Sequence, residues 1–160
     1  MKPKKLDGDV NMAGYSTTQP SVGYLPDRPT ILYFSSNRPG GMGGFDIWYT
    51  ILYEVKTPSQ CVNLGTPVNT TGNEITPFYD NNSGRLYFSS DWHLGFGGYD
   101  VFCSIGQRDS WQEPFNLGST LNSPANDLYF TVNSASKSGY LTSNRRGSYF
   151  ITDNTCCNDI

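Results

Sequence analysis

Three aspartates occupy one position of a repeated motif, and carboxylates at a fixed spacing are groups that could do acid–base chemistry. They are Asp46, Asp100 and Asp159, each followed directly by an aliphatic residue. Glycoside hydrolases use such carboxyl groups as acid, base or nucleophile beside the scissile bond. An enzyme needs its catalytic pair once, whereas these aspartates recur in every copy. We therefore predict that each one accepts hydrogen bonds from turn amides.

Other polar residues with catalytic potential are also better explained by structure. Asn37, Asp91 and Asn144 recur at the end of one motif, and we predict that they cap strand ends. His93 is the only histidine, so a Ser-His-Asp triad or a histidine-containing zinc site would have to use it. No nucleophile motif accompanies His93, and we expect an exposed loop histidine.

Metal binding has weak support in the sequence. Asp80, Asn82 and Gly84 resemble part of a calcium loop, but the twelfth position of an EF-hand would be Asp91 instead of glutamate. A hairpin turn is the favoured interpretation, and calcium held in a loop is left as an alternative. We expect no metal site and no cofactor.

The cysteines do not form a zinc motif, because no two of them have the Cys-x-x-Cys spacing. They are Cys61, Cys103, Cys156 and Cys157, for which three disulfide connectivities exist. Cys103 is expected to be a buried or free thiol. In an oxidising compartment Cys156 or Cys157 could bridge an enlarged loop.

Composition excludes several classes of function. The chain has 160 residues, 36% hydrophobic and 16% charged, with a formal charge of -3. A nucleic-acid surface built from bulk positive charge is therefore not expected. No apolar stretch approaches the ~20 residues that cross a bilayer, so we expect no direct membrane insertion. No signal-peptide core is visible, which predicts either a cytosolic chain or an excised portion of a longer precursor.

An internal repeat of about 53 residues organises the chain. Its first marker reads LYFSSN at 32–37, LYFSSD at 86–91 and GYLTSN at 139–144. The second marker reads GGFDI at 43–47, GGYDV at 97–101 and CCNDI at 156–160. A third marker reads VNLG at 62–65 and FNLG at 115–118. Independent recurrence of three markers makes chance similarity improbable.

Each repeat predicts four short antiparallel strands, because β-branched and aromatic runs alternate with glycine-rich and asparagine-rich turns. In the second copy they are expected at 75–79, 85–90, 99–105 and near 111–117. Four such strands at this period are typical of a β-propeller blade. The fold class is thus all-β, with blades at 6–64, 65–117 and 118–160, the last incomplete.

Three blades are too few for a closed ring, since propellers have 4–8 blades. We expect the chain to be part of a larger propeller, with self-assembly into a ring and an open piece held by a partner as alternatives. Stacking of neighbouring blades is predicted to bury two columns of side chains. These are Tyr33, Tyr87 and Tyr140 in one column and Phe34, Phe88 and Leu141 in the other.

The stretch LYFSSNRPGGMGGFDIW at 32–48 resembles the blade signature of TolB-type propeller repeats. More narrowly, it is similar to the propeller of OmpA-family envelope lipoproteins linked to type IX secretion and gliding. The opening GYSTTQP at 14–20 and the NLG segments fit the same pattern. The departures are WHL at 92–94 where the first copy has RPG, and the cysteines that replace the double glycine.

The resemblance implies a non-catalytic binding or scaffold propeller, periplasmic and associated with the outer membrane, with protein partners in the cell envelope. A cell-surface or secreted location is the alternative. The family often carries a peptidoglycan-binding domain, but that domain contributes no residue to this sequence. Peptidoglycan binding therefore carries over to no residue here.

The loops between the second and third strands are predicted to share one face of the propeller and to bind the partner. Aromatic residues and arginine are favoured in protein interfaces. The candidates are Arg38, Met42, Trp92, His93, Phe96, Arg145 and Arg146. The alternative function is a carbohydrate-binding or glycoside-cleaving propeller. A sialidase would need a paired arginine cluster, and no pattern in the sequence pairs the arginines.

Overall fold

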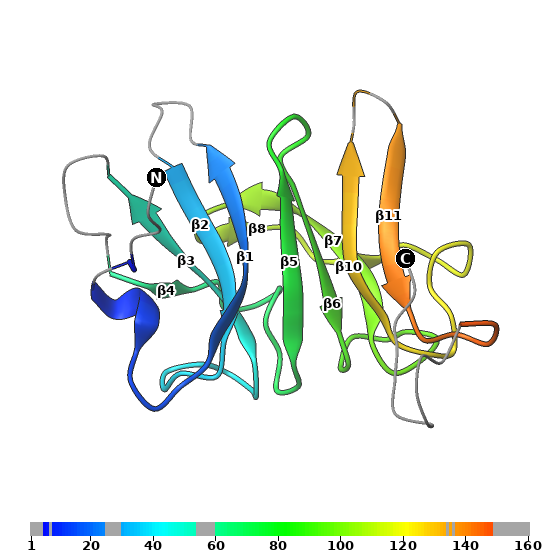
Figure 1. The fold of residues 1–160 in the computed structure, drawn as a ribbon, viewed down its shortest axis with the longest axis horizontal. Helices are drawn as coiled ribbons and strands as arrows, with labels where there is room; N and C mark the ends of the chain where they lie inside the picture. Colours follow the sequence, from blue (N-terminus) through cyan, green and yellow to red (C-terminus); the bar gives the residue numbers. More distant parts are fainter. Residues whose placement is uncertain are drawn as a thin grey trace.

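The computed structural model describes residues 5–6, 8–24, 30–53, 60–133, 135 and 137–148 (Figure 1). In this part the protein is all-β, with three antiparallel sheets and one short 3-10 helix, η1 (Gly8–Asn11). The described residues contain no helix of the length and apolarity needed to cross a membrane. The predicted all-β class is thereby confirmed.

Each sheet corresponds to one sequence repeat, and we call the sheets the first, second and third units. The first unit contains β1 (Thr17–Tyr24), β2 (Thr30–Ser36), β3 (Asp46–Leu52) and β4 (Val62–Asn63) in that spatial order. The second contains β5 (Glu74–Asp80), β6 (Arg85–Ser90), β7 (Asp100–Gln107), β8 (Ser110–Trp111) and β9 (Phe115–Asn116). The third contains β10 (Asp127–Asn133) and β11 (Ser138–Ser143).

The strand count differs from four per repeat in the second and third units. The strand expected near 111–117 is two short strands, β8 and β9, that both pair with β7. Pro114 lies between them, and proline cannot donate a ladder hydrogen bond. The third unit has two strands in the described part, because its expected third strand falls in residues outside it. None of these sheets closes on itself.

The first strands of the three units, β1, β5 and β10, lie side by side across the molecule (Figure 1). Each has a register shift at a residue with positive φ: Gln19 at 55°, Thr76 at 53° and Tyr129 at 53°. The Gln19 Oε1 accepts a hydrogen bond from the Thr76 backbone N–H at 3.0 Å. The first strands of the three repeats therefore share the same backbone irregularity at the same repeat position.

Neighbouring units pack face to face through aromatic side chains. Tyr33 is fully buried, with its ring 5.1 Å from that of Tyr79 and 5.9 Å from that of Trp111. Tyr87 is the counterpart of Tyr33 and packs on Phe130 at 5.1 Å. Burying one such side chain stabilises the fold by about 1.5–3 kcal/mol. The larger apolar cluster thus joins the first and second units, and a smaller one lies between η1 and the first sheet.

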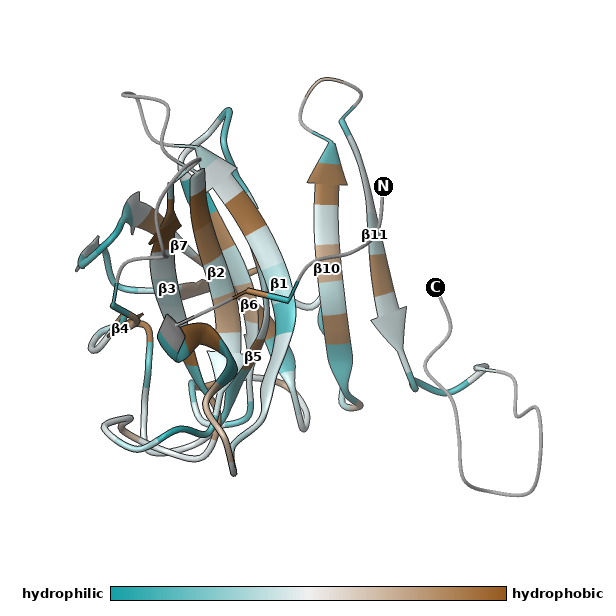
Figure 2. Cartoon of the chain, turned by 60° about the vertical axis from the view of Figure 1, so that its left-hand side comes forward, coloured by the Kyte–Doolittle hydropathy of each residue, from teal (hydrophilic) through white to brown (hydrophobic). Residues whose placement is uncertain are grey.

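The prediction for the third unit is wrong, because Tyr140 is 68% exposed. Figure 2 shows β10 and β11 at the edge of the array with hydrophobic bands on both strands. No further sheet covers this face within the described residues. In the second column, Phe34 is buried under Val10 of η1 instead of under another sheet, and Leu141 is half-buried.

The double glycines of the second marker, Gly43-Gly44 and Gly97-Gly98, lie where the backbones of consecutive units come into close contact. The Gly44 N–H donates to the Gly72 carbonyl at 2.8 Å, and the Gly98 N–H donates to the Ala125 carbonyl at 3.0 Å. A Cβ on Gly43 would lie 2.2 Å from the Gly72 oxygen. A Cβ on Gly97 would lie 2.4 Å from the Ala125 oxygen. Only glycine allows the loop of one unit to approach the segment that leads into the next.

Replacing Gly43 or Gly97 with alanine should therefore lower the free energy of unfolding by about 1–3 kcal/mol, because overpacking against backbone cannot relax easily. Urea unfolding followed by tryptophan fluorescence measures this. Met42→Ala is the matched control, since Met42 is exposed in the same loop and should change stability by less than about 0.5 kcal/mol. Equal stabilities for Gly43→Ala and Met42→Ala would contradict the account.

Candidate functional site

Two of the repeated aspartates hold the loops that precede β3 and β7. The Asp46 Oδ2 accepts a hydrogen bond from the Met42 N–H at 2.7 Å. The Asp100 Oδ2 accepts hydrogen bonds from Phe96 N–H at 2.7 Å and Gly97 N–H at 3.0 Å. Both aspartates are buried, and burial raises the pKa of Asp46. Asp159 lies outside the described residues.

The Asn37, Asp91 and Asn144 side chains each tie the end of a strand to the residue before the unit's first strand. Their Oδ1 atoms accept hydrogen bonds from the N–H groups of Ser16 at 2.9 Å, Asn73 at 2.7 Å and Asn126 at 2.8 Å, respectively. The same bond in three units identifies a structural role for this position.

Arg38 does not lie on the loop face where the sequence placed it. Its side chain is 5% exposed, and its guanidinium lies 4.8 Å from the Phe34 ring centre. The Arg38 Nη2 donates to the Val10 carbonyl at 2.7 Å, and Nε donates to the Ser36 Oγ at 3.0 Å. Arg38 is therefore bound inside its own unit and is not available to a partner.

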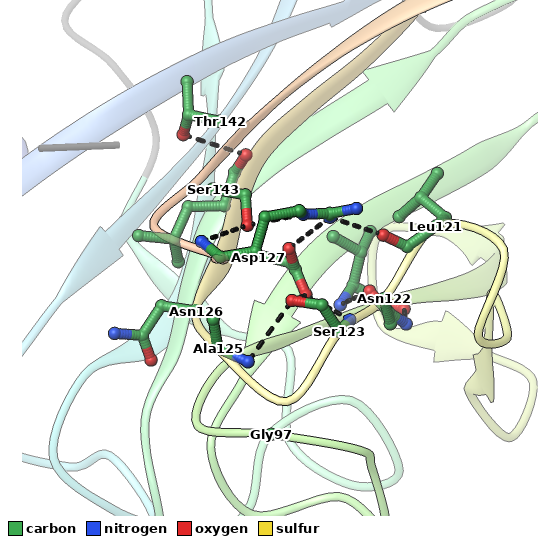
Figure 3. Close-up of polar contacts among 12 residues, drawn as sticks. Gly97, Leu121, Asn122, Ser123, Ala125, Asn126, Asp127, Thr142 and Ser143 are labelled. Carbon is green, nitrogen blue, oxygen red and sulfur yellow. Dashed lines mark hydrogen bonds and ion pairs between the residues drawn. The ribbon is translucent and has the colours of Figure 1, made fainter. Parts of the chain in front are cut away.

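Arg145 repeats this arrangement in the third unit. Its Nη2 donates to the Leu121 carbonyl at 2.7 Å and to the Asp127 Oδ1 at 2.6 Å, and its Nε donates to the Ser143 Oγ at 2.9 Å. Figure 3 shows Leu121, Asp127 and Ser143 gathered at this point. Arg145 is partly exposed, but its contacts are those of a structural anchor. Arg146 next to it is exposed.

The second unit departs from this pattern by one residue. Trp92 stands where the other units have arginine, and the next residue, His93, takes over the anchoring contact. The His93 Nε2 lies 3.0 Å from the Val68 carbonyl, the counterpart of the Val10 and Leu121 carbonyls. Because a carbonyl only accepts, this nitrogen carries the hydrogen. The His93 ring also packs 5.1 Å from that of Phe102. His93 is thus an anchor and not a free loop histidine.

The shift of the anchor leaves three large apolar side chains on the surface. Trp92 is 64% exposed, Leu94 is 95% exposed and Phe96 is 51% exposed. We call residues 92–96 the apolar loop. Their counterparts in the first unit are Arg38, Gly40 and Met42. The fold therefore does not require large apolar residues at the first two of these positions.

The backbone of the apolar loop is held although its side chains are exposed. The Ser90 Oγ accepts a hydrogen bond from Trp92 N–H at 3.1 Å. Asp100 binds the other end, and His93 fixes the middle to the core. The backbone of the loop is therefore held by contacts within the protein, and a partner would not have to order it on binding.

Leu94 was missed by the sequence analysis. The available signal was the alternation of large apolar residues in a glycine-rich loop at a position where the first copy has Gly40. Of the remaining candidates, Met42 is exposed on the neighbouring loop. Both loops contact Gly72, through the Gly44 hydrogen bond and through a close approach of the Trp92 Cβ.

A buried carboxylate lies beneath the apolar loop. Glu74 is fully buried, and its carboxylate accepts hydrogen bonds from Thr70 N–H at 2.8 Å, Thr70 Oγ1 at 2.6 Å and Ser90 Oγ at 2.8 Å. Burial raises its pKa in spite of these bonds. Glu74 thereby connects Ser90, which accepts the Trp92 N–H hydrogen bond, to Thr70 in the segment before β5.

In the part of the chain that the structure describes, no group of three or more His, Cys, Asp or Glu side chains lies close enough together to hold a metal ion. Asp80 of the calcium-loop alternative is engaged within its turn, where its Oδ1 accepts from Asn82 N–H and its Oδ2 from Ser83 Oγ. That turn joins β5 to β6 as a hairpin.

Two of the cysteines are described, and both are free thiols. Cys103 is buried in β7, where burial raises its pKa to about 11. Cys61 is partly buried. Cys156 and Cys157 lie outside the described residues. At neutral pH the Cys103 thiol stays protonated and inert, because thiolate is the reactive form.

No protein-family model, no curated protein and no solved structure matches the chain. The fold and the site define the class of protein: an all-β repeat protein in which one unit carries an exposed apolar loop whose backbone is held by hydrogen bonds.

His93→Ala should lower the free energy of unfolding by about 1–3 kcal/mol, because it removes a ring from the core and leaves the Val68 carbonyl without its partner. Trp92→Ala, one residue away, should be neutral within about 0.5 kcal/mol. Urea unfolding of the two variants measures the difference. A larger loss for Trp92→Ala than for His93→Ala would refute the anchoring role.

The raised pKa of Glu74 predicts that the free energy of unfolding falls as pH rises. A carboxyl whose pKa is raised by folding stabilises the protein when protonated, and this contribution is lost as pH rises through the folded-state pKa. Relative to Glu74→Gln, the wild-type protein should therefore become less stable as pH rises above the unfolded value of about 4.5. Urea unfolding of both proteins from pH 4 to 7 tests this. The prediction would be wrong if the difference in unfolding free energy between the wild type and Glu74→Gln stayed constant over this range, or if the wild type gained stability relative to the variant as pH rose.

Proposed function

We propose that the chain is a non-catalytic binding and scaffold segment of a β-propeller whose apolar loop docks a protein of the bacterial envelope. The observation that carries the proposal is the high exposure of Trp92, Leu94 and Phe96 on a loop whose backbone is held by hydrogen bonds. We assign the chain to the TolB-type repeats of OmpA-family envelope lipoproteins, on the signature at 32–48. This assignment places it in the periplasm, in an outer-membrane-associated assembly of the type IX secretion kind.

Propeller blades account for the packing of the units. The first unit is a four-stranded antiparallel sheet in which each strand pairs with the next. The first strands of the three units are adjacent, and the unit faces bury Tyr33 and Tyr87 against the following unit. Radial stacking of small sheets about an axis has these two features.

Protein binding by the apolar loop has favourable energetics. Burying each of the three side chains would contribute about 1.5–3 kcal/mol. Tryptophan is enriched among interface residues that carry most of the binding energy. The first unit has arginine and glycine at the positions of Trp92 and Leu94, so the fold does not require large apolar side chains there. Protein binding would give these exposed side chains a use.

A sialidase-like reaction has weaker support. Its arginine cluster would draw on Arg38 and Arg145, but these two are bound within the first and third units by contacts to their own strands and linkers. The glycan alternative is therefore left with the exposed aromatic rings of the apolar loop, Trp92 and Phe96, which could stack on a sugar.

The test compares a triple alanine variant of the apolar loop with Phe115→Ala, which removes an equally exposed apolar side chain outside it. Each purified protein is used as bait in envelope extract from a Gram-negative bacterium, and the captured proteins are identified by mass spectrometry. We expect a protein that is captured by the wild type and Phe115→Ala, and lost at least tenfold with the triple variant. Loop-dependent binding to a glycan array without such a protein would favour the alternative instead.

A further inference from the structure

The carboxyl group of Glu74 has a counterpart in the third unit but lacks that counterpart's arginine. Glu74 and Asp127 are the first residues of β5 and β10, and each accepts hydrogen bonds from the N–H and the hydroxyl of the residue four positions earlier. Asp127 is also bound by the Arg145 guanidinium at 2.6 Å. In the second unit Trp92 stands at the arginine position, so within the described residues no guanidinium binds Glu74.

Two hydroxyl groups connect Glu74 to the apolar loop and to the segment beneath it. The Ser90 Oγ donates to the Glu74 Oε1 at 2.8 Å and accepts from the Trp92 N–H at 3.1 Å. The Thr70 Oγ1 donates to the same Oε1 at 2.6 Å and accepts from the Gly72 N–H at 3.0 Å. Each hydroxyl thus gives its hydrogen to the carboxyl group and uses its oxygen to hold a backbone N–H.

The serines at the position of Ser90 in the other units have different partners. The Ser36 Oγ donates to the Ser16 carbonyl at 2.7 Å. The Ser143 Oγ accepts from the Arg145 N–H at 3.2 Å and from its Nε at 2.9 Å. The serine that holds the apolar loop is therefore the one of the three that donates to a buried carboxyl group.

The hydrogen bonds around Glu74 fit a carboxylate better than a carboxylic acid. A carboxylate only accepts, whereas the protonated group must also donate its hydrogen. All the hydrogen bonds described for this carboxyl group are donated to it, so an added hydrogen finds an acceptor only when Ser90 or Thr70 turns its hydroxyl. A Ser90 oxygen that accepts from the acid has one lone pair left, for which the N–H groups of Trp92 and His93 compete.

Two titratable groups of other segments interact electrostatically with Glu74. A charged His93, in the apolar loop, favours the carboxylate. Tyr99, just before β7, has a pKa raised to about 12, chiefly by burial, and is neutral in the acidic and neutral range. The first unit contributes the Phe45 carbonyl, which accepts from the Glu74 N–H at 2.6 Å. Burial outweighs the favourable contacts and raises the pKa of Glu74, so protonation occurs in milder acid than for an exposed glutamate.

We propose that Glu74 is a proton switch for the apolar loop, which holds the Trp92 backbone when it is ionised and releases it when it takes up a proton. The inference deepens the proposed function and rests on it, because it regulates the same loop. Affinity for the partner is then complete above the folded-state pKa of Glu74 and falls as pH drops through it. The ionised carboxylate lowers the global stability but orders the loop, so these two effects of pH have opposite signs.

The test follows the loop by NMR in the full chain, without a partner, from about pH 4 to 7.5. The carbon shift of the Glu74 carboxyl reports its titration, and hydrogen exchange gives the protection factor of the Trp92 amide. We expect this protection factor to fall about tenfold as Glu74 becomes protonated, with the same midpoint, since one hydrogen bond is lost. The Arg145 amide is the matched control, because it donates to the Ser143 Oγ in the counterpart position and should not change at that midpoint.

Two variants separate the effect of Glu74 from that of His93. Glu74→Gln cannot ionise, and Ser90→Ala removes the hydroxyl that joins the carboxyl group to the loop. In both variants the Trp92 amide should have the low protection of the acid form at every pH. Circular dichroism must show that they are folded, and if neither folds, the coincidence of the two midpoints in the wild type decides.

Two NMR results would overturn the inference. One is protonation of Glu74 without a change at the Trp92 amide. The other is a pH-dependent change at Trp92 that persists in folded Glu74→Gln, because it would then follow His93 or another group.

Capture from Gram-negative envelope extract, at one pH above and one below the Glu74 midpoint, connects the switch to function. We expect the wild type to capture the loop-dependent protein at least tenfold less at the lower pH, and Glu74→Gln to capture little at either. Equal capture by the wild type at both values would overturn the inference and leave the proposed function intact. Absence of loop-dependent capture at both values, with a normal transition at Trp92, would instead refute the proposed function alone.

Discussion

Each sheet in this protein has two apolar faces and too few strands to cover either one, so the contact between consecutive units is the constraint on which the structure depends. The same pair of asparagine hydrogen bonds recurs at both internal junctions. An asparagine, Asn69 or Asn122, binds both backbone groups of a buried residue in the preceding unit. The glycine pairs allow backbone to meet backbone beside it. Together they set the distance at which the aromatic side chains pack.

The same constraint explains why one loop is free to acquire a function. Each unit needs a polar side chain that binds the carbonyl before the docking asparagine, and arginine or histidine can supply it. In the second unit the anchoring residue, His93, lies one position after the arginine of the other units. Trp92 occupies the arginine position, and its side chain is exposed to solvent. The apolar loop is therefore a local exception in a repeated frame. Such exceptions are where function is expected in otherwise consistent sequences.

Repetition made much of the fold predictable, since three copies report the same strands and turns. Asp46 and Asp100 could be given a turn-holding role because a catalytic residue would not recur. The errors arise where one copy differs in its surroundings. An arginine in a glycine-rich loop suggests exposure, and the sequence does not reveal that the Val10 carbonyl lies within reach of Arg38. Tyr140 matches its counterparts in type, but no sequence pattern shows which unit lies at an edge. Leu94 aligns with Gly40, so the first copy gives no indication of an exposed apolar side chain at this position.

The most direct test of the stacking of units is native-state hydrogen exchange at the Ile47 and Val101 amides, followed by NMR. Both amides donate to the docking asparagines of the next unit. If the junctions hold the protein together, these two amides should exchange only through global unfolding, with a protection free energy equal to that from urea unfolding. Exchange at these amides as fast as in the exposed apolar loop would show that the units do not depend on one another.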